Sequence, residues 1–187
     1  MTKIKYNTQW VLDELKSGAS VEYIFFWGHR GKPGQVTKAC FSQWFPSSFV
    51  VGGDEFFTAE HWMMAHKAKL FDDEENYQEI LKRPDPSAAK AFGRKVRNFD
   101  PNIWDASKFD IVVQGNVHKF SQNDDFSRFL IATEGKVLVE ASPVDPVWGI
   151  GLSHDNPDAQ NPAKWRGPNL LGFALMEARD VLMERET

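Results

Sequence analysis

Residues 136–151 read KVLVEASPVDPVWGIG, and they join a clear strand pattern to a stiff loop. The first half, 136–142, alternates apolar and polar side chains with a period of two, which predicts a β-strand. Asp145 follows between two prolines, and Trp148 and Gly149 come directly after it. Proline favours an extended backbone at the residue before it, and glycine lets another group approach the backbone closely. On these residues alone, an ordinary Asp-Pro turn and one wall of a binding site are equally good interpretations.

The segments around this strand predict further strands and several helices. We expect strands in 21–28 and 40–45 and a hairpin over 48–57 that turns at Gly52-Gly53. We expect an N-terminal helix with Thr8 as its N-cap. The other expected helices are 59–71 after a Thr58 N-cap, a short helix with Pro86 in its first turn, 110–122, 124–135, and a last helix from about Pro168 to Glu184. Together these elements predict an α+β fold, a single domain with a small, mainly antiparallel sheet packed by several helices.

The composition excludes several classes of protein. The formal net charge of the 187 residues is -4, which argues against a general affinity for nucleic acid. The single cysteine, Cys40, cannot form an internal disulfide. No stretch approaches the roughly 20 apolar residues that cross a bilayer, so we expect no membrane association and a cytoplasmic protein. His61 and His66 are five residues apart and point about 140° apart on a helix, so we expect no metal site.

Glu60 is the first candidate for chemistry, two positions after the expected Thr58 cap. Lys67 and Phe71 follow on nearly the same helical face, which is compatible with a polar pocket. Acidic residues also favour helix N-termini because the helix dipole stabilises them. A solvated helix-start acid or an exposed ion pair therefore explains this pattern as well.

The ordered set of motifs resembles one family, the NADAR family of YbiA-like N-glycosidases. The resemblance runs from about Tyr23 to Leu182 and leaves residues 1–20 as an N-terminal extension. Its motifs in this chain are FFWGHR, TKACFSQWFPSSF, FFTAEHWMMAHKAKLFDD, AKAFGRKVRNFD, IWDASKFDIVVQGNVHKFSQ, FLIATEGKVLVEASPVDPVWGIGL and WRGPNLLGFALMEAR.

The resemblance implies an α+β fold and hydrolysis of the N-glycosidic bond between a ribose and a base, without a cofactor or metal. The implied partner is a small molecule: a ribosylamino-pyrimidine phosphate from early riboflavin synthesis, or a guanine that carries ADP-ribose. The alternative is a non-catalytic module that binds ADP-ribose or a related nucleotide. The oligomeric state stays open.

Three residues match the chemical positions of the family. Glu60, in TAEHW, is implied as the acid/base. Asp145, in SPVDPVWG, would orient the ribose hydroxyls or stabilise positive charge at C1′. Lys38, in TKACFSQWF, would form an imine with the opened sugar, or it would only bind a phosphate or carbonyl group while water attacks directly.

Further residues are expected to bind substrate. The arginines and lysine would hold phosphate, the tryptophans would stack on a base, and Asn169 and Trp165 of the last family block would line the pocket. The expected binding residues are Arg30, Lys67, Arg94, Trp104, Trp148, Gly149 and Asn169.

Overall fold

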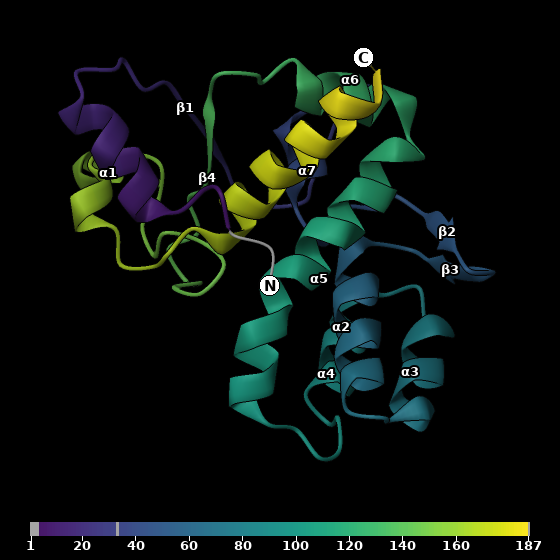
Figure 1. Cartoon of the computed structure of the whole chain (residues 1–187). Helices are drawn as coiled ribbons and strands as arrows, with labels where there is room; N and C mark the ends of the chain where they lie inside the picture. The colour runs from purple at the N-terminus through teal and green to yellow at the C-terminus, as the bar shows by residue number, and fades with distance from the viewer. Residues whose placement is uncertain (1–3, 33, 187) are drawn as a thin grey trace. The chain divides into compact units, whose positions relative to one another are not determined.

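Strand β1 (Tyr23–Phe26) and strand β4 (Val137–Glu140) form a two-stranded parallel sheet. Both strands were expected, and their register places Phe26 opposite Glu140. The first three residues of β4 are buried, and helix α7 (Leu170–Glu186) packs on this strand. Figure 1 shows β4 and α7 in this arrangement. The chain between the two strands is long enough for the crossover that a parallel pair needs.

The hairpin was predicted correctly. Strands β2 (Phe49–Val51) and β3 (Asp54–Phe56) pair in an antiparallel manner. Gly52 and Gly53 make the turn with φ of 63° and 93°. Two successive positive φ angles are what a tight hairpin turn requires, and glycine adopts them at little cost.

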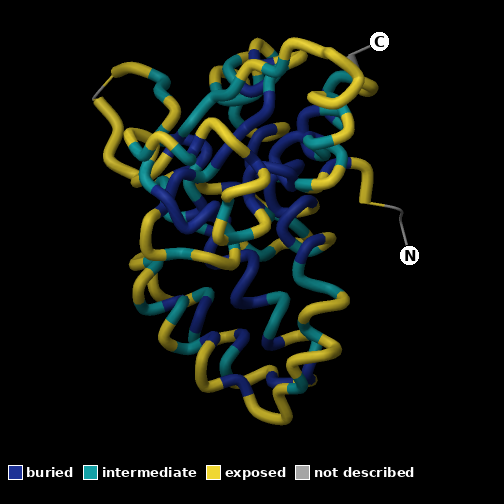
Figure 2. The backbone as a smooth tube through the Cα atoms, turned by 90° about the vertical axis from the view of Figure 1, so that its left-hand side faces the viewer, coloured by how far each residue is buried: buried dark blue, intermediate teal, exposed yellow. Residues whose placement is uncertain are grey.

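Helix α2 (Ala59–Leu70) lies at the centre of a second group of elements. It packs against α3 (Glu74–Leu81), α4 (Pro86–Gly93) and α5 (Pro101–Ser121), as Figure 1 shows. Two glycines permit this contact: a Cβ on Gly93 would lie 2.1 Å from Met64 Sδ, and one on Gly115 would lie 2.4 Å from the Trp62 ring. Burial in Figure 2 follows the inner faces of these helices.

Four expectations about elements were wrong. The helix expected over 110–122 begins earlier, at Pro101, because Asp100 caps it. Residues 40–45 form no strand; instead Lys38–Phe41 is a short 3-10 helix, η1, whose N-cap is Thr37. The sheet is not mainly antiparallel, because one pair of strands is parallel and the other antiparallel. The N-terminal helix α1 (Thr8–Lys16) is capped by Asn7, whose side chain accepts from Trp10 N, and not by Thr8. The α+β class itself is confirmed.

The structure is a computed structural model that describes residues 4–32 and 34–186. Its elements group into two compact units, one up to Gly28 and again from Arg128 onward, the other His29–Ser127. Helix α6 (Asp124–Ile131) spans the boundary, and the short helices η2 (Pro157–Gln160) and η3 (Pro162–Lys164) belong to the first unit. None of the described helices is long and apolar enough to cross a membrane.

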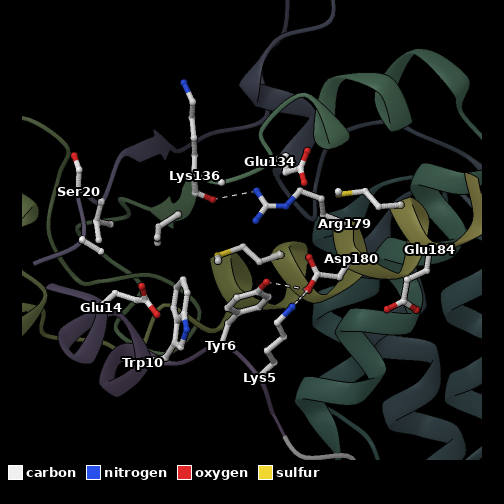
Figure 3. Close-up of a pocket in the computed structure, with 16 residues that line it drawn as sticks. Lys5, Tyr6, Trp10, Glu14, Ser20, Glu134, Lys136, Arg179, Asp180 and Glu184 are labelled. Carbon is white, nitrogen blue, oxygen red and sulfur yellow. Dashed lines mark hydrogen bonds and ion pairs between the residues drawn. The ribbon is translucent and has the colours of Figure 1, made fainter. Parts of the chain in front are cut away.

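The expected N-terminal extension is part of the first unit. Lys5 N donates to Glu177 Oε1 at 2.6 Å, and the Tyr6 hydroxyl donates to Asp180 Oδ2 at 2.8 Å. Figure 3 shows Lys5 and Tyr6 pointing at Asp180 on α7, beside a cavity of about 500 Å³. None of the residues expected to act on or bind substrate lines this cavity. Residues 1–3 of the extension lie outside the described residues.

Candidate active site

Glu60 lies in the first turn of α2, and its side chain is buried with only 3% exposure. The Thr58 cap was predicted correctly: its Oγ1 accepts from His61 N and also contacts His61 Nδ1 at 2.8 Å. Glu60 N donates to the carbonyl of Gln43 at 2.9 Å. Because glutamate is almost never fully buried without a specific role or partner, a solvated helix-start acid does not describe Glu60.

Lys38 begins η1 in the same unit and has an exposed side chain. The backbone of this segment is ordered by Thr37, whose Oγ1 accepts from Ala39 N at 3.4 Å. Five residues after Lys38, Gln43 accepts the hydrogen bond from Glu60 N. A single short segment therefore carries the candidate lysine and contacts the backbone of the candidate acid.

Two residues of α5 that the sequence analysis did not single out bond to this segment. Lys119 is fully buried, and its Nζ donates to the carbonyls of Cys40 at 2.6 Å and Ser42 at 2.9 Å. Asn116 Nδ2 donates to Gln43 Oε1 at 3.1 Å. The sequence does hold a signal for them, because both lie on the helical face that buries Val112.

Lys67 and Trp104, both expected to bind substrate, lie in contact in this unit. Lys67 Nζ is 4.1 Å from the centroid of the Phe99 ring and 5.6 Å from that of Trp104. Burial lowers the pKa of the half-buried Lys67. An ammonium group over aromatic rings is stabilised by their quadrupoles, so these contacts hold the lysine in place whether or not a phosphate is bound.

The two arginines expected to bind phosphate are exposed, and no described contact joins them. Arg94 is the C-cap of α4, where its N–H donates to Lys90 O. Arg30 belongs to the glycine-rich loop after β1, drawn largely yellow at the upper left of Figure 2. A cavity of about 570 Å³ lies beside this loop, with His29, Lys32, Phe45 and Phe126 among its lining residues.

In the first unit, the Asp145 carboxylate organises its own loop. Asp145 Oδ1 accepts from Val147 N at 2.9 Å and from Trp148 N at 2.8 Å, which forms an Asx turn. Among the described residues these hydrogen bonds reach only Oδ1, so Oδ2 keeps its acceptor capacity for another group. Trp148 is half-buried, and its carbonyl accepts from Leu171 N at 3.0 Å.

Gly149 and Asn169 join this loop to the end of β4. A Cβ on Gly149 would lie 2.7 Å from the Glu140 carbonyl oxygen. Asn169 is fully buried with φ of 56°; its Oδ1 accepts from Glu140 N, and its Nδ2 donates to Leu138 O, both at 2.9 Å. The fold explains both residues, and a contact with substrate stays a prediction for each.

The two histidines of α2 contact backbone carbonyls, and the cysteine is buried. His61 Nε2 lies 2.7 Å from Arg83 O, and His66 Nδ1 lies 3.0 Å from Trp62 O. Burial raises the pKa of the Cys40 thiol to about 11, which disfavours the thiolate that a nucleophile needs. The part of the chain that the structure describes contains no cluster of three or more His, Cys, Asp or Glu side chains arranged to hold a metal ion.

A model of the NADAR domain matches residues 25–183. The chain belongs to the NADAR family. An N-glycosidase of Acanthamoeba polyphaga mimivirus is 46% identical over 164 residues, which cover 85% of this chain and 95% of that protein. The chloroplastic riboflavin biosynthesis protein PYRR of Zea mays is 32% identical over 155 residues, 76% of this chain but 23% of that protein.

The NMR structure of the E. coli protein YbiA has the same fold. It superposes with a TM-score of 0.71 at 26% identity and covers 88% of this chain and 87% of that one. These similarities confirm the family and the enzyme class expected from the motifs, a hydrolase of N-glycosyl bonds.

Proposed function

We propose that this protein hydrolyses the N-glycosidic bond between a ribose and a base. The substrate is a ribosylamino-pyrimidine phosphate or a guanine that carries ADP-ribose. The observation that carries the proposal is the buried Glu60 at the start of α2, whose N–H is bonded to the segment that begins with Lys38. The names of an N-glycosidase and a riboflavin biosynthesis protein among the relatives support the reaction and one of its substrates.

In this proposal Glu60 is the general acid and base. Cleavage leaves negative charge on the departing base and positive charge at C1′ of the sugar. A positioned carboxyl group that protonates the leaving nitrogen contributes roughly 10²–10⁴-fold to such a reaction. The helix cap and the bond to Gln43 hold the backbone of Glu60 from two sides, which is the kind of positioning that proton transfer requires.

We propose that Lys38 acts as the nucleophile. The ribosylamine opens to an imine at C1′, and the Lys38 amine adds to C1′ and displaces the base as its free amine. Water then hydrolyses the lysine imine, which releases the sugar as an aldehyde and regenerates the amine. Exposure of Lys38 gives an incoming sugar access to it. The competing route is direct attack by water, with Lys38 only binding the substrate.

The role of Glu60 is tested by Glu60→Gln, which keeps the size and shape of the side chain but cannot exchange a proton at neutral pH. We expect the loss of nearly all release of ribose 5-phosphate or ADP-ribose, measured by mass. Glu55→Gln is the matched control, because Glu55 is exposed on β3 in the same unit. Unchanged turnover in Glu60→Gln would remove Glu60 from the mechanism.

The imine is tested by adding borohydride during turnover. Reduction should leave a stable sugar adduct on Lys38 in the wild type, located by peptide mass. The exposed Lys95 provides the control variant, Lys95→Ala, in which the adduct should persist. Full activity in Lys38→Ala would exclude the covalent route and leave direct attack by water.

Asp145 remains our choice for the second acid of the reaction, next to the ribose. Asp145→Asn keeps the Oδ1 acceptor for Val147 N and Trp148 N and removes only the charge. Asp145→Ala removes the charge and the turn. A loss of activity in both variants with a loss of stability only in Asp145→Ala supports a role at the sugar, whereas an active Asp145→Asn would restrict Asp145 to the loop.

The two substrate classes are separated by a direct assay of both. We propose Arg30, Lys67 and Arg94 as phosphate ligands and Trp104 and Trp148 as stacking surfaces, and these roles serve either class. The cavity beside the glycine-rich loop, about 570 Å³, lies within the usual range of small-molecule sites. Tight binding of ADP-ribose with no product from either class would instead favour a non-catalytic module.

A further inference from the structure

Lys119 is a buried lysine that the proposed reaction does not use. Its side chain has 0% exposure in the middle of the second unit, near the end of the long helix α5. Burying an ammonium group is unfavourable unless hydrogen bonds compensate for the lost water. An apolar residue of the same length would fill this place without that cost, so the fold has a use for the polar end of this side chain.

Within residues 4–32 and 34–186, the hydrogen bonds of Lys119 Nζ go to backbone carbonyls. It donates to Cys40 O at 2.6 Å and to Ser42 O at 2.9 Å, which are near the end of η1 and just after it. Burial lowers the pKa of this amine to about 7. A neutral amine has two N–H groups and a charged one has three, so both carbonyls keep a donor in either form.

The segment that Lys119 holds is the one that carries the proposed chemistry. Lys38 begins η1, and Gln43 accepts the hydrogen bond from Glu60 N at 2.9 Å. One turn before Lys119, Asn116 donates to the side chain of Gln43 at 3.1 Å. Helix α5 thus donates three hydrogen bonds to residues 40–43. These residues follow Lys38, the proposed nucleophile, and end at Gln43, which binds the backbone of Glu60.

We propose that Lys119 is a positioning residue that sets the segment 38–43 and thereby the relative placement of Lys38 and Glu60. The inference rests on the proposed function, since it assigns a purpose to the placement of those two groups. Without the two bonds, the Cys40 carbonyl loses the donor from Lys119, and the Ser42 carbonyl keeps the longer bond from Phe45 N at 3.3 Å. The segment then rearranges to satisfy its buried backbone groups. A displacement of about 1 Å at reacting groups costs on the order of 100-fold in rate.

The test is Lys119→Met, which keeps the length of the side chain and removes its donors. We expect kcat to fall about 10- to 100-fold while KM stays within about threefold. Lys119→Gln retains a neutral donor and should recover part of the loss. Lys108→Met is the matched control on the same helix, because Lys108 pairs with the exposed Asp105 on its own helix; this variant should leave kcat unchanged.

Amide hydrogen exchange of residues 38–43 gives a readout that does not depend on the substrate. We expect faster exchange there in Lys119→Met and not in Lys108→Met. Wild-type kcat in Lys119→Met, or a lower kcat with unchanged exchange of this segment, would overturn the proposal. If the wild type turns over no N-riboside, the proposed function fails, and the exchange comparison still decides whether Lys119 holds the segment.

Discussion

Replacement of Asn169 by alanine should destabilise the protein more strongly than most point mutations. The side chain is fully buried, and both of its polar groups bond to the backbone of β4. The residue also has φ of 56°, in the left-handed region that asparagine tolerates better than alanine does. The variant therefore removes two hydrogen bonds and introduces backbone strain at the start of α7.

The expected loss follows from these two effects. Two buried hydrogen bonds that leave Glu140 N and Leu138 O without partners cost about 2–4 kcal/mol together. Alanine in the left-handed region adds about 1 kcal/mol. The sum is about 3–5 kcal/mol in the free energy of unfolding, which corresponds to a fall of about 6–20 °C in Tm for a chain of this size.

Urea denaturation followed by circular dichroism measures this loss, with Asn169→Gly as the informative partner. The Asn169→Gly variant loses the same two hydrogen bonds, but glycine adopts a positive φ without strain. The unfolding free energy of Asn169→Gly should therefore be about 1 kcal/mol higher than that of Asn169→Ala. Asn102→Ala, at an exposed site of α5, should stay within about 0.5 kcal/mol of the wild type. An unfolding free energy of Asn169→Ala within about 1 kcal/mol of the wild type would refute the reasoning.

Three further predictions concern backbone contact, capping and pH. Gly149→Ala should cost about 1–3 kcal/mol in thermal denaturation, because its Cβ would lie 2.7 Å from the Glu140 carbonyl oxygen; a stable variant would show that the loop can shift freely. Thr58→Ala removes the cap of α2 and should cost about 1 kcal/mol of unfolding free energy, and serine should restore most of it. Burial lowers the pKa of His61 and His66 below the ordinary 6.5, so the unfolded chain binds more protons than the folded one. The stability that the two neutral histidines contribute should be complete above about pH 6.5, and the unfolding free energy should fall as the pH drops below that value. Urea titrations at several pH values should show a shallower fall in His66→Gln than in the wild type. An identical fall would exclude His66 as a source of the pH dependence.

Local sequence patterns predicted the elements whose conformation depends on near neighbours. The Gly52-Gly53 turn, the Thr58 cap and the helix that begins at Pro86 all appear where the sequence places them. Each of them is decided by the φ angle of a residue or by a side chain that bonds to the backbone two or three residues away. Short-range steric and hydrogen-bonding effects of this kind are present in the sequence itself.

The sequence gives the candidate residues of the site but not their surroundings, because those depend on contacts between distant parts of the chain. Glu60 and Lys38 were found from motifs, but the sequence left open whether Glu60 is solvated, and the structure buries it. Lys119 and Asn116 were missed, because a lysine near the end of a helix usually interacts with the helix C-terminus and with water. Their role depends on a segment about 75 residues earlier in the chain that only folding brings beside them.

The sequence by itself determined the α+β class, most helices and strands, and the family motifs with their acidic and basic residues. Only the tertiary structure decided that β1 and β4 run parallel, that residues 38–41 form a 3-10 helix rather than a strand, and that Glu60 is buried. Helical periodicity and turn chemistry act over a few residues, whereas strand partners and the burial of a charge depend on groups far apart in sequence. The free energy of those contacts comes from packing and desolvation that no short stretch of residues contains.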